Sequence, residues 1–536
     1  MTVLGIHCGF SIHTHEPGAA LIKNGKLVAV CEEERLLRVK NALGYLPTYS
    51  IKEVLKKGGV KFKKIKLVVS TGITVKGYKK ILEKYFMDQF GHKPKILIVH
   101  HHLSHIASAF YASGYENSAC LSLDAYGDGA SGMIAQASRK KGIRILEYID
   151  KQNSIGTFYS AATEFLGYQD GDEYKVMGLA SYGRPIINFD KIIRFKNNFW
   201  KIDKSFFVEQ QTPFVHRYSN KFVRKFKKYK RLSGEKIKQR HKDFAASVQK
   251  ISDIAISHAF KKALKKSAFN RNLCFAGGLA LNCTSIRKIL YSNFKSNFFI
   301  PSNPSDRGLA VGCAYLGSMK LKKLPKPNSS PYLGKSFSNG QILKELKNNC
   351  INFTKPKNIS KTTASLLSKG KIIGWFNGRS EIGARALGNR SILADPRKKN
   401  MKDILNKKIK YREDFRPFAP AAIEEHAEEY FETKGLKIPY MNCTVDTKLT
   451  KKNKIPSVVH TDGTSRLQTV SKKFNPEFYK LLKEFHKITG VPILINTSFN
   501  LKGQPIVDSP RDALMTFFGS GIDYLVLNSF LISKNN

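Results

Sequence analysis

The chain has 536 residues, of which 42% are hydrophobic and 11% aromatic, so it can bury more than one core and we expect two large domains or three smaller ones. No apolar run reaches the ~18 residues of a membrane span, no signal peptide precedes the first strand pattern, and the eight cysteines form no Cys-x-x-Cys pair, which predicts a cytoplasmic protein with buried free thiols. The formal net charge of +50 favours polyanionic partners, but the lysines are spread over the whole chain, which is more typical of a solvated surface.

Short apolar runs open the chain and predict a β-meander at 3–8, 19–23 and 26–31, with a hairpin turn at Asn24-Gly25. From residue 50 onward helical and strand patterns alternate, which predicts a layered α/β fold. The expected helices lie near 50–57, 78–90 and 241–266, and the expected strands at 66–70, 95–99, 118–124, 131–137 and 143–149. We find no internal repeat in the sequence.

A histidine-rich helix is predicted directly after the strand at 95–99. His101 and His105 lie one turn apart on one face of this helix, so two imidazoles can hold one metal ion. Asp124 ends another apolar run, before turn glycines, and Asp306 is a second turn carboxylate. Because histidines are also common at the exposed starts of helices, the pair alone leaves a surface role open.

Residues 217–242 are the most basic stretch, and Phe222, Phe226 and Tyr229 are interleaved with its lysines and arginines. Such a pattern occurs in proteins that bind single-stranded nucleic acid. The same aromatic residues have helical spacing, so an amphipathic helix that packs its apolar face inward is the interpretation we favour. Farther along, a strand ends in Gly277-Gly278 before a helix, an arrangement that can bring a nucleotide against backbone amides.

A linker rich in lysine, proline and serine is expected within 319–338, followed by a second α/β unit that begins with a strand at 371–376. Arg385 and Arg390 lie close to turn glycines, and Lys410 and Arg416 follow among apolar residues. Arginine forks in such positions suit bidentate recognition of phosphate or carboxylate. Near the C-terminus an apolar strand delivers the hydroxyl and amide side chains of 496–500 to a turn, where they can hydrogen-bond a phosphate.

Six motifs together resemble the O-carbamoyltransferases of the nodulation, cephamycin and aminoglycoside type, from Leu4 to Leu527. They are His-x-x-x-His (101–105), Glu-x-Lys-Val-Met-Gly-Leu-Ala (173–180), Ala-Gly-Gly-x-Ala-Leu-Asn (276–282), Gly-x-Arg-Ala-Leu-Gly-Asn-Arg-Ser (383–391), Phe-Arg-Pro-Phe-Ala-Pro (415–420) and Asn-Thr-Ser-Phe-Asn (496–500). The resemblance implies a duplicated α/β domain of the actin-like ATPase superfamily at 1–320, similar to the tRNA threonylcarbamoyl transferase subunit. It also implies a YrdC-like α/β domain at 338–536, similar to the enzyme that makes threonylcarbamoyl-adenylate.

The same resemblance implies a two-step reaction. In the C-terminal domain carbamoyl phosphate and ATP, with magnesium, would form carbamoyl-adenylate and release pyrophosphate. In the N-terminal domain the carbamoyl group would pass to a hydroxyl of a sugar or secondary metabolite, as in antibiotic biosynthesis, and AMP would leave.

Residues carry over from the family motif by motif. The implied metal ligands are His101, His105, Asp124 and Asp306. The ion is expected to be iron(II), although the ligand set also permits zinc or manganese. The implied transfer pocket contains His15, Lys40, Glu173 and Lys175, with the general base among the nearby histidines and acids. The implied nucleotide and phosphate contacts are Gly277, Gly278, Asn282, Arg385, Arg390, Lys410, Arg416, Ser498 and Asn500.

One departure from the family pattern falls beside the transfer pocket: Glu16 follows His15 where the family usually has aspartate, which adds a methylene and can alter acceptor choice.

Two other functions remain open, a transferase of the tRNA threonylcarbamoyladenosine type and a nucleic-acid-binding protein with a degenerate enzyme core. For the leading interpretation the expected partners are carbamoyl phosphate and a hydroxyl-bearing small molecule, with no nucleic acid or membrane, and a homodimer stays open.

Overall fold

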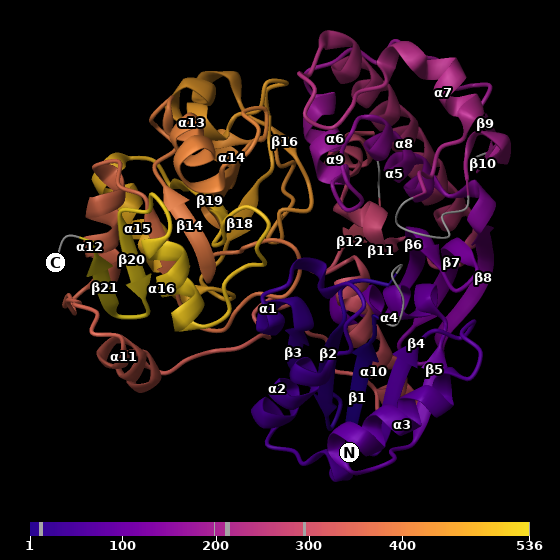
Figure 1. Ribbon diagram of the computed structural model, residues 1–536, viewed down its shortest axis with the longest axis horizontal. Coiled ribbons are helices and arrows are strands. Elements are labelled where there is room, and N and C mark those ends of the chain that lie inside the picture. Colours follow the sequence, from indigo (N-terminus) through magenta and orange to yellow (C-terminus); the bar gives the residue numbers. More distant parts are fainter. Residues whose placement is uncertain (10–13, 198, 209–214, 293–295, 535–536) are drawn as a thin grey trace. The chain divides into compact units, whose positions relative to one another are not determined.

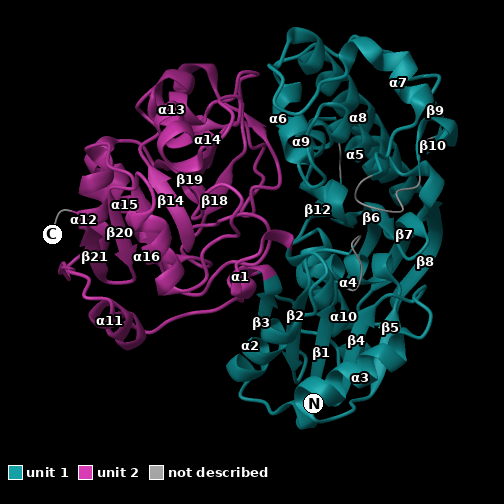
Figure 2. Cartoon of the chain, in the orientation of Figure 1, with its two compact units in different colours: residues 1–33, 42–329 teal, residues 34–41, 330–536 magenta. Residues whose placement is uncertain are grey.

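A computed structural model describes residues 1–9, 14–197, 199–208, 215–292 and 296–534. The chain divides into two compact units (Figure 2). Unit 1 comprises Met1–Glu33 and Ala42–Ser329, and unit 2 comprises Glu34–Asn41 and Ser330–Asn536. The division after Ser329 falls within the segment expected to be a linker. Among the described residues no helix is long and apolar enough to cross a membrane.

The first sheet of unit 1 has the strand order β3-β2-β1-β4-β5. Its strands are β1 (Thr2–His7), β2 (Gly18–Lys23), β3 (Lys26–Glu32), β4 (Leu67–Thr71) and β5 (Ile96–Val99). The meander β1-β2-β3 is antiparallel, whereas β4 and β5 are added parallel to β1 through the helices α2 (Thr48–Gly58) and α3 (Tyr78–Phe90). The predicted meander and the predicted alternation of helices and strands are both confirmed.

The second sheet of unit 1 repeats this plan, in the order β12-β11-β6-β7-β8. Its strands are β6 (Asn117–Gly127), β7 (Ala130–Ser138), β8 (Gly142–Asp150), β11 (Asn272–Ala276) and β12 (Asn297–Phe299). Again an antiparallel meander is followed by two strands parallel to its first strand. We found no repeat in the sequence, so the duplication survives in the strand order and directions but not in residue identity.

Two helices of unit 1 each follow one sheet in the sequence but pack on the other sheet (Figure 1). This arrangement brings residues of the candidate site close to one another. Helix α4 (His101–Ser113) follows the last strand of the first sheet but packs on β6, β7 and β11 of the second. Helix α10 (Leu309–Lys320) follows the last strand of the second sheet but packs on β1, β2 and β4 of the first. The two helices also pack closely on each other, because a Cβ at Gly312 would lie 1.9 Å from the carbonyl oxygen of Ser104.

The remaining elements of unit 1 lie between β8 and β12. They are α5 (Ile155–Phe165), α6 (Glu173–Ala180), β9 (Ile193–Lys196), β10 (Phe199–Ile202), α7 (Asn220–Phe226), α8 (Gln239–Lys266) and α9 (Cys283–Tyr291). The basic stretch 217–242 contains α7, and Phe222 and Phe226 are buried beside Phe244 of α8. Its aromatic residues therefore pack inward instead of offering bases a stacking surface, which confirms the amphipathic interpretation.

Unit 2 is built on a mixed seven-stranded sheet in the order β18-β15-β19-β14-β13-β20-β21. Its strands are β13 (Ile373–Phe376), β14 (Arg390–Ala394), β15 (Ala419–Ile423), β18 (Gln468–Val470), β19 (Ile493–Ser498), β20 (Tyr524–Leu527) and β21 (Phe530–Ser533), and a short pair is formed by β16 (Val445–Asp446) and β17 (Thr464–Ser465). Its helices are α11 (Asn339–Asn348), α12 (Ile359–Ser368), α13 (Met401–Leu405), α14 (Ala427–Tyr430), α15 (Pro476–Thr489) and α16 (Pro510–Phe518).

A segment from the N-terminal part of the chain belongs to unit 2. Residues 34–41, which hold most of α1 (Glu33–Leu37), are anchored by two arginines. The guanidinium of Arg35 donates to the carbonyl of Gly383 (2.9 Å), and that of Arg38 donates to the carbonyls of Ile506 (2.6 Å) and Pro505 (3.0 Å). The spacing of the acids and arginines in this segment is by itself typical of ion pairs along a helix, and the structure shows in addition that the arginines bind distant backbone carbonyls.

Candidate metal centre

The first two turns of α4 present His101 and His105 on the face predicted from their spacing. The Oδ2 of Asp128 accepts a hydrogen bond from the backbone N–H of His101 (2.8 Å) and so fixes the first residue of the helix. His102 points elsewhere and is fully buried. Its Nε2 donates to the carbonyl of Ala130 (3.1 Å), and its Nδ1 therefore accepts from the hydroxyl of Ser122 (2.7 Å), so His102 has a structural role.

Four side chains converge in front of these turns, and they are the four ligands expected from the sequence. One ligand atom of each of His101, His105, Asp124 and Asp306 lies within 4.8 Å of the other three. The two Nε2 atoms are 3.0 Å apart, and Oδ1 of Asp306 is 3.4 Å from each of them. Oδ2 of Asp124 is 3.2 Å from Nε2 of His105 and 3.9 Å from Nε2 of His101.

Backbone amides hold Asp124 in place at the end of β6. The pairing of β6 with β7 is irregular between Leu123 and Gly127, and Asp124 lies in this irregular segment. Its Oδ1 accepts a hydrogen bond from the N–H of Ala125 (2.8 Å) and its Oδ2 accepts one from the N–H of Gly278 (2.9 Å). A ligand supported in this way keeps its orientation when a cation is bound.

The charges of the cluster fit a cation. Burial would lower the pKa of His105 and raise those of Asp124 and Asp306, but the attraction between imidazole and carboxylate reverses each shift. The pKa of His105 rises to about 9, and the pKa values of both aspartates fall below their usual range. The Nδ1 of His105 is buried without a hydrogen-bond partner among the described residues, so its polar contacts are all at Nε2, inside the cluster.

The donor set therefore fits a divalent ion of the iron(II), manganese or zinc type, since two imidazoles and carboxylates with free coordination positions suit such ions. His105 is fully buried, whereas the carboxylates of Asp124 and Asp306 are 16% and 14% exposed. The cluster is thus open to solvent on its carboxylate side, where a substrate could approach.

Two further histidines flank Asp306. His15 is half-exposed, and its Nδ1 lies 4.0 Å from Oδ2 of Asp306. Burial lowers the pKa of His15, but the charges of Asp306 and Glu16 outweigh this effect and raise it. His7 has its Nε2 3.8 Å from Oδ2 of Asp306 and donates from it to the carbonyl of His15 (3.1 Å). Burial lowers the pKa of His7 to about 4, so its imidazole is neutral.

Glu173 and Lys175, also expected in the transfer pocket, lie on α6. The Oε1 of Glu173 accepts a hydrogen bond from Ser160 (2.6 Å), and burial raises the pKa of this carboxyl. Lys175 donates to Oδ2 of Asp172 (2.7 Å). The charge of Asp170 contributes to the raised pKa values of both Glu173 and His15, so these two expected pocket residues share one electrostatic environment. Lys40, in contrast, is an exposed residue of unit 2.

The glycine pair and Asn282, expected to meet a nucleotide, have local partners in this structure. The N–H of Gly277 donates to the carbonyl of Pro304 (2.7 Å), and that of Gly278 to Asp124, as described above. Asn282 is the N-cap of α9 and also accepts a hydrogen bond from Gln249 (3.0 Å). A 3-10 helical turn (Gly278–Leu281) begins at the glycine pair with Gly277 as its N-cap, and α9 follows from Cys283. The predicted helix start at Gly277-Gly278 is therefore present as a 3-10 turn, and its contact with a nucleotide stays a prediction.

Unit 2 brings three residues expected at the adenylate-forming step into direct contact. Lys410 is buried at the end of a π-helical turn, Asn406–Lys410, and reaches Ser498 and Asn500 at the end of β19. Its Nζ donates to the carbonyls of both residues and to Oδ1 of Asn500 (2.9 Å). Burial first, and then the charges of Arg412 and Arg416, lower the pKa of Lys410.

The other two arginines expected to meet phosphates differ in their accessibility. Arg390 is fully buried, its guanidinium packs over the ring of Phe376 at 3.6 Å from the centroid, and it donates to four carbonyl oxygens, the nearest that of Asn377 (2.8 Å). Arg385 is partly exposed. Arg416 is also partly exposed, and its Nη1 lies 3.6 Å from Oε2 of Glu413, whereas Arg390 supports the loop that carries Arg385.

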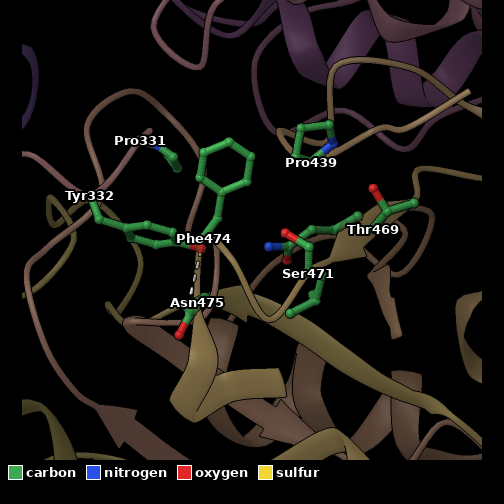
Figure 3. A pocket seen from close by; sticks show the side chains of 9 residues that line it. Pro331, Tyr332, Pro439, Thr469, Ser471, Phe474 and Asn475 are labelled. Atoms are coloured by element: carbon green, nitrogen blue, oxygen red, sulfur yellow. Dashed lines mark hydrogen bonds between the residues drawn. The ribbon is translucent and has the colours of Figure 1, made fainter. Parts of the chain in front are cut away.

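A separate, small pocket of unit 2 is lined by Tyr332, Phe474 and two prolines together with polar side chains (Figure 3). Asn475 donates from its amide to the hydroxyl of Tyr332 (3.1 Å) at its base. None of the expected site residues lines it. The pocket is therefore distinct from both the metal cluster of unit 1 and the group of Lys410, Ser498 and Asn500 in unit 2.

Our sequence reasoning missed His7, Asp128 and the pair of Glu16 with Arg307. Asp128 follows Asp124 by four residues in the same turn-rich segment, so an acid beside turn glycines was its available signal. Arg307 directly follows Asp306 in the sequence. His7 carries no local signal, because its partners are distant in sequence, and the departure from the family pattern at Glu16 does not reveal its pairing with Arg307. Glu16 contacts Arg307 and Ser305, the two sequence neighbours of Asp306. Its side chain is therefore directed at the segment that carries a metal ligand and not at the site of an acceptor substrate.

Family models match two separate parts of this chain. A family model described as carbamoyltransferase N-terminus matches residues 76–315, and one described as carbamoyltransferase C-terminus matches residues 364–534. The chain is 36% identical over 550 residues to nodulation protein NolNO of Sinorhizobium fredii, covering 97% of this chain and 79% of that protein. It is 38% identical over 447 residues to nodulation protein NolO of Bradyrhizobium diazoefficiens, covering 81% of this chain and 79% of that protein.

Among solved structures, the crystal structure of T. kodakarensis HypF overlaps 60% of this chain and 47% of that chain, with 15% sequence identity and a TM-score of 0.38.

Proposed function

This chain belongs to the carbamoyltransferase family, and from that premise we propose that it is an ATP-dependent O-carbamoyltransferase that modifies a hydroxyl of a sugar or secondary metabolite. The observation that carries the proposal is that each unit holds its own cluster of polar side chains. Unit 1 has an open cluster of imidazoles and carboxylates, and unit 2 has a buried lysine among hydroxyl and amide groups with two arginines close to it.

The first step belongs to unit 2, for which we propose the YrdC-like fold. Carbamoyl phosphate loses its phosphate to water, an oxygen of the resulting carbamate bonds to the α-phosphorus of ATP, and pyrophosphate leaves. Lys410, Arg385 and Arg416 neutralise the phosphates, and Ser498 and Asn500 hold the reacting end by hydrogen bonds. Lys410 already contacts both Ser498 and Asn500, which supports their acting as one group. Magnesium accompanies ATP as its usual counterion.

The second step belongs to unit 1, for which we propose the actin-like duplicated fold. The oxygen of the acceptor hydroxyl bonds to the carbamoyl carbon, AMP leaves, and the hydroxyl proton passes to a base. His101, His105, Asp124 and Asp306 would hold a divalent ion, with iron(II) the expected one, which supplies positive charge to the departing phosphate. His15 is partly exposed beside Asp306 and can hydrogen-bond the incoming substrate. Glu173, with its raised pKa, can take up or hold a proton in the same pocket.

The rival functions receive less support. A nucleic-acid-binding protein would use the 217–242 stretch, but Phe222 and Phe226 are packed against Phe244. A tRNA-modifying enzyme of the threonylcarbamoyladenosine type would be expected to divide the two steps between chains, and this chain matches both halves of the carbamoyltransferase models.

The test is to incubate the metallated protein with ATP and carbamoyl phosphate and to measure pyrophosphate. Pyrophosphate should form without an acceptor, and AMP should follow when a panel of sugars and aminoglycosides is added. His105→Ala should keep pyrophosphate formation and lose transfer, because it changes only unit 1. If a folded, metallated sample forms no pyrophosphate, the proposed function is wrong.

A further inference from the structure

The position of Asp306 depends on residues on either side of it. All polar contacts of its carboxylate within the described residues are to imidazole nitrogens, those of His7, His15, His101 and His105. Asp124, by comparison, receives two backbone amides. None of these contacts comes from a backbone amide, and the geometry points to Glu16, which binds the residues on both sides of Asp306, as the positioning residue for this ligand. This inference rests on the metal centre of the proposed function.

The carboxylate of Glu16 contacts both sequence neighbours of Asp306, Ser305 and Arg307. Its Oε2 accepts a hydrogen bond from the hydroxyl of Ser305 (2.7 Å) and another from the backbone N–H of Arg307 (3.2 Å). Its Oε1 lies 2.5 Å from Nη1 of Arg307. One carboxylate thus makes three contacts to a segment of three residues, whose middle member is the ligand.

The rest of the Asp306 segment is fixed from its other side. The carbonyl of Pro304 accepts the hydrogen bond from Gly277, and the N–H of Gly308 donates to the carbonyl of Ser305 (2.8 Å) to close a short turn. The backbone on both sides of Asp306 is therefore held, on one side by the strand that ends in Gly277 and on the other by Glu16. Second-sphere contacts of this kind set the direction in which a ligand presents its lone pairs.

Glu16 also connects Asp306 to His15. Its backbone has a φ of 61°, in the left-handed region, which is an uncommon conformation for a residue with a side chain. The preceding residue, His15, has its carbonyl fixed by His7. Since the Glu16 side chain is tied to Ser305 and Arg307, the loop that carries His15 and the loop that carries Asp306 move as one piece. Glu16 thereby sets the spacing between a metal ligand and an expected substrate contact.

The charge of Glu16 is essential to this arrangement because the side chains of Glu16 and Arg307 are both at least nine-tenths buried. A neutral glutamine can keep one or two of the hydrogen bonds, but the carboxylate that then remains beside the guanidinium is that of Glu32, whose Oε2 lies 3.9 Å from Nε of Arg307. We expect the Arg307 side chain then to shift toward Glu32 and to pull the neighbouring Asp306 away from the imidazoles.

The experiment measures binding of Co²⁺ to the metal-free, full-length protein by its visible absorption, a readout that does not need activity. Glu16→Gln should weaken Co²⁺ binding about 10-fold or more and alter the spectrum. Glu16→Asp keeps the charge, and aspartate tolerates a positive φ, so its Co²⁺ affinity should lie between those of the wild type and Glu16→Gln. This variant tests the inference if Glu16→Gln does not fold.

The matched control is Glu33→Gln. Glu33 is a fully buried glutamate of unit 1 that accepts hydrogen bonds from the hydroxyl of Ser50 (2.5 Å) and from the amides of Ser50 and Tyr49 (2.7 and 3.0 Å). It therefore resembles Glu16 in burial and in accepting hydrogen bonds from a serine hydroxyl and from backbone amides, but among the described residues it pairs with no arginine and contacts no metal ligand. Glu33→Gln should lose stability and keep its Co²⁺ affinity.

Two results would overturn the inference: Co²⁺ affinity of Glu16→Gln within twofold of the wild type, or an equal loss in Glu33→Gln. Failure of the proposed function is distinguishable, because it appears as absent pyrophosphate formation in a wild-type protein that still binds Co²⁺, whereas a wild-type protein that binds no Co²⁺ would overturn this inference. Hydrogen exchange of the metal-free protein reports on the same contact, and the amide of Arg307 should exchange faster in Glu16→Gln and not in Glu33→Gln.

Discussion

Gly127 controls the position of the His101 ring. A Cβ at this position would lie 2.2 Å from Cδ2, 2.4 Å from Cγ and 2.7 Å from Nε2 of His101. Ordinary carbon contacts are about 3.5 Å or longer, so Gly127→Ala requires the ring to move by about 1.3 Å. Functional sites tolerate displacements of about 0.5 Å, so we expect Gly127→Ala to weaken metal binding about 10- to 100-fold, or about 1.4–2.8 kcal/mol.

Gly129, two residues later in the same hairpin, provides the control. It has a φ of 87° with nothing within 4 Å of an added Cβ, whereas the φ of Gly127 lies outside the left-handed region. Gly129→Ala should therefore cost about 1 kcal/mol of stability without weakening metal binding. Titration of both metal-free variants with Co²⁺, together with thermal unfolding, separates the two effects. Metal affinity of Gly127→Ala within twofold of the wild type would refute the steric argument.

Three further predictions concern other parts of the chain. Lys410→Met should reduce pyrophosphate release at least ~100-fold, because it removes the cation that joins Ser498 and Asn500, and release within threefold of the wild type would contradict this. Burial lowers the pKa of His460 from 6.5 to about 4, so the stability it contributes is present above pH 6.5 and is lost as the pH falls toward 4. Urea unfolding at several pH values should show this loss in the wild type and a smaller one in His460→Gln, and equal slopes would refute the assignment. Phe222→Ala should lower the free energy of unfolding by about 3–5 kcal/mol and Arg224→Ala by less than ~0.5 kcal/mol, and the reverse order in urea unfolding would contradict the amphipathic interpretation.

Much of the fold of unit 1 could be predicted from local patterns. Apolar runs predicted the first meander and the strands that form the second, and a helix was predicted directly after the strand at 95–99, where α4 lies. The duplication could not be predicted, because it consists of matching strand orders and directions, which different residues can satisfy as long as the buried faces remain apolar. The exchange of α4 and α10 between the sheets likewise has no local signal.

The anchoring of residues 34–41 to unit 2 was also invisible in the sequence. Glu34, Arg35 and Arg38 have the spacing of ordinary ion pairs along a helix. In the structure the two arginines donate to backbone carbonyls of Gly383, Pro505 and Ile506, more than 300 residues away in the chain. A carbonyl acceptor belongs to every residue type, so no sequence pattern identifies it.

The sequence by itself determined which side chains can form the metal centre: the i, i+4 spacing of His101 and His105 follows from helix geometry, and Asp124 and Asp306 are turn carboxylates that the family resemblance implies as ligands. Only the tertiary structure decided how those carboxylates are held. Asp124 is fixed by the amide of Gly278, and Asp306 by the grip of Glu16 on Ser305 and Arg307. The physical reason is that ligand identity depends on residue type, whereas ligand orientation depends on hydrogen bonds and buried charges supplied by loops that meet only when both sheets are folded.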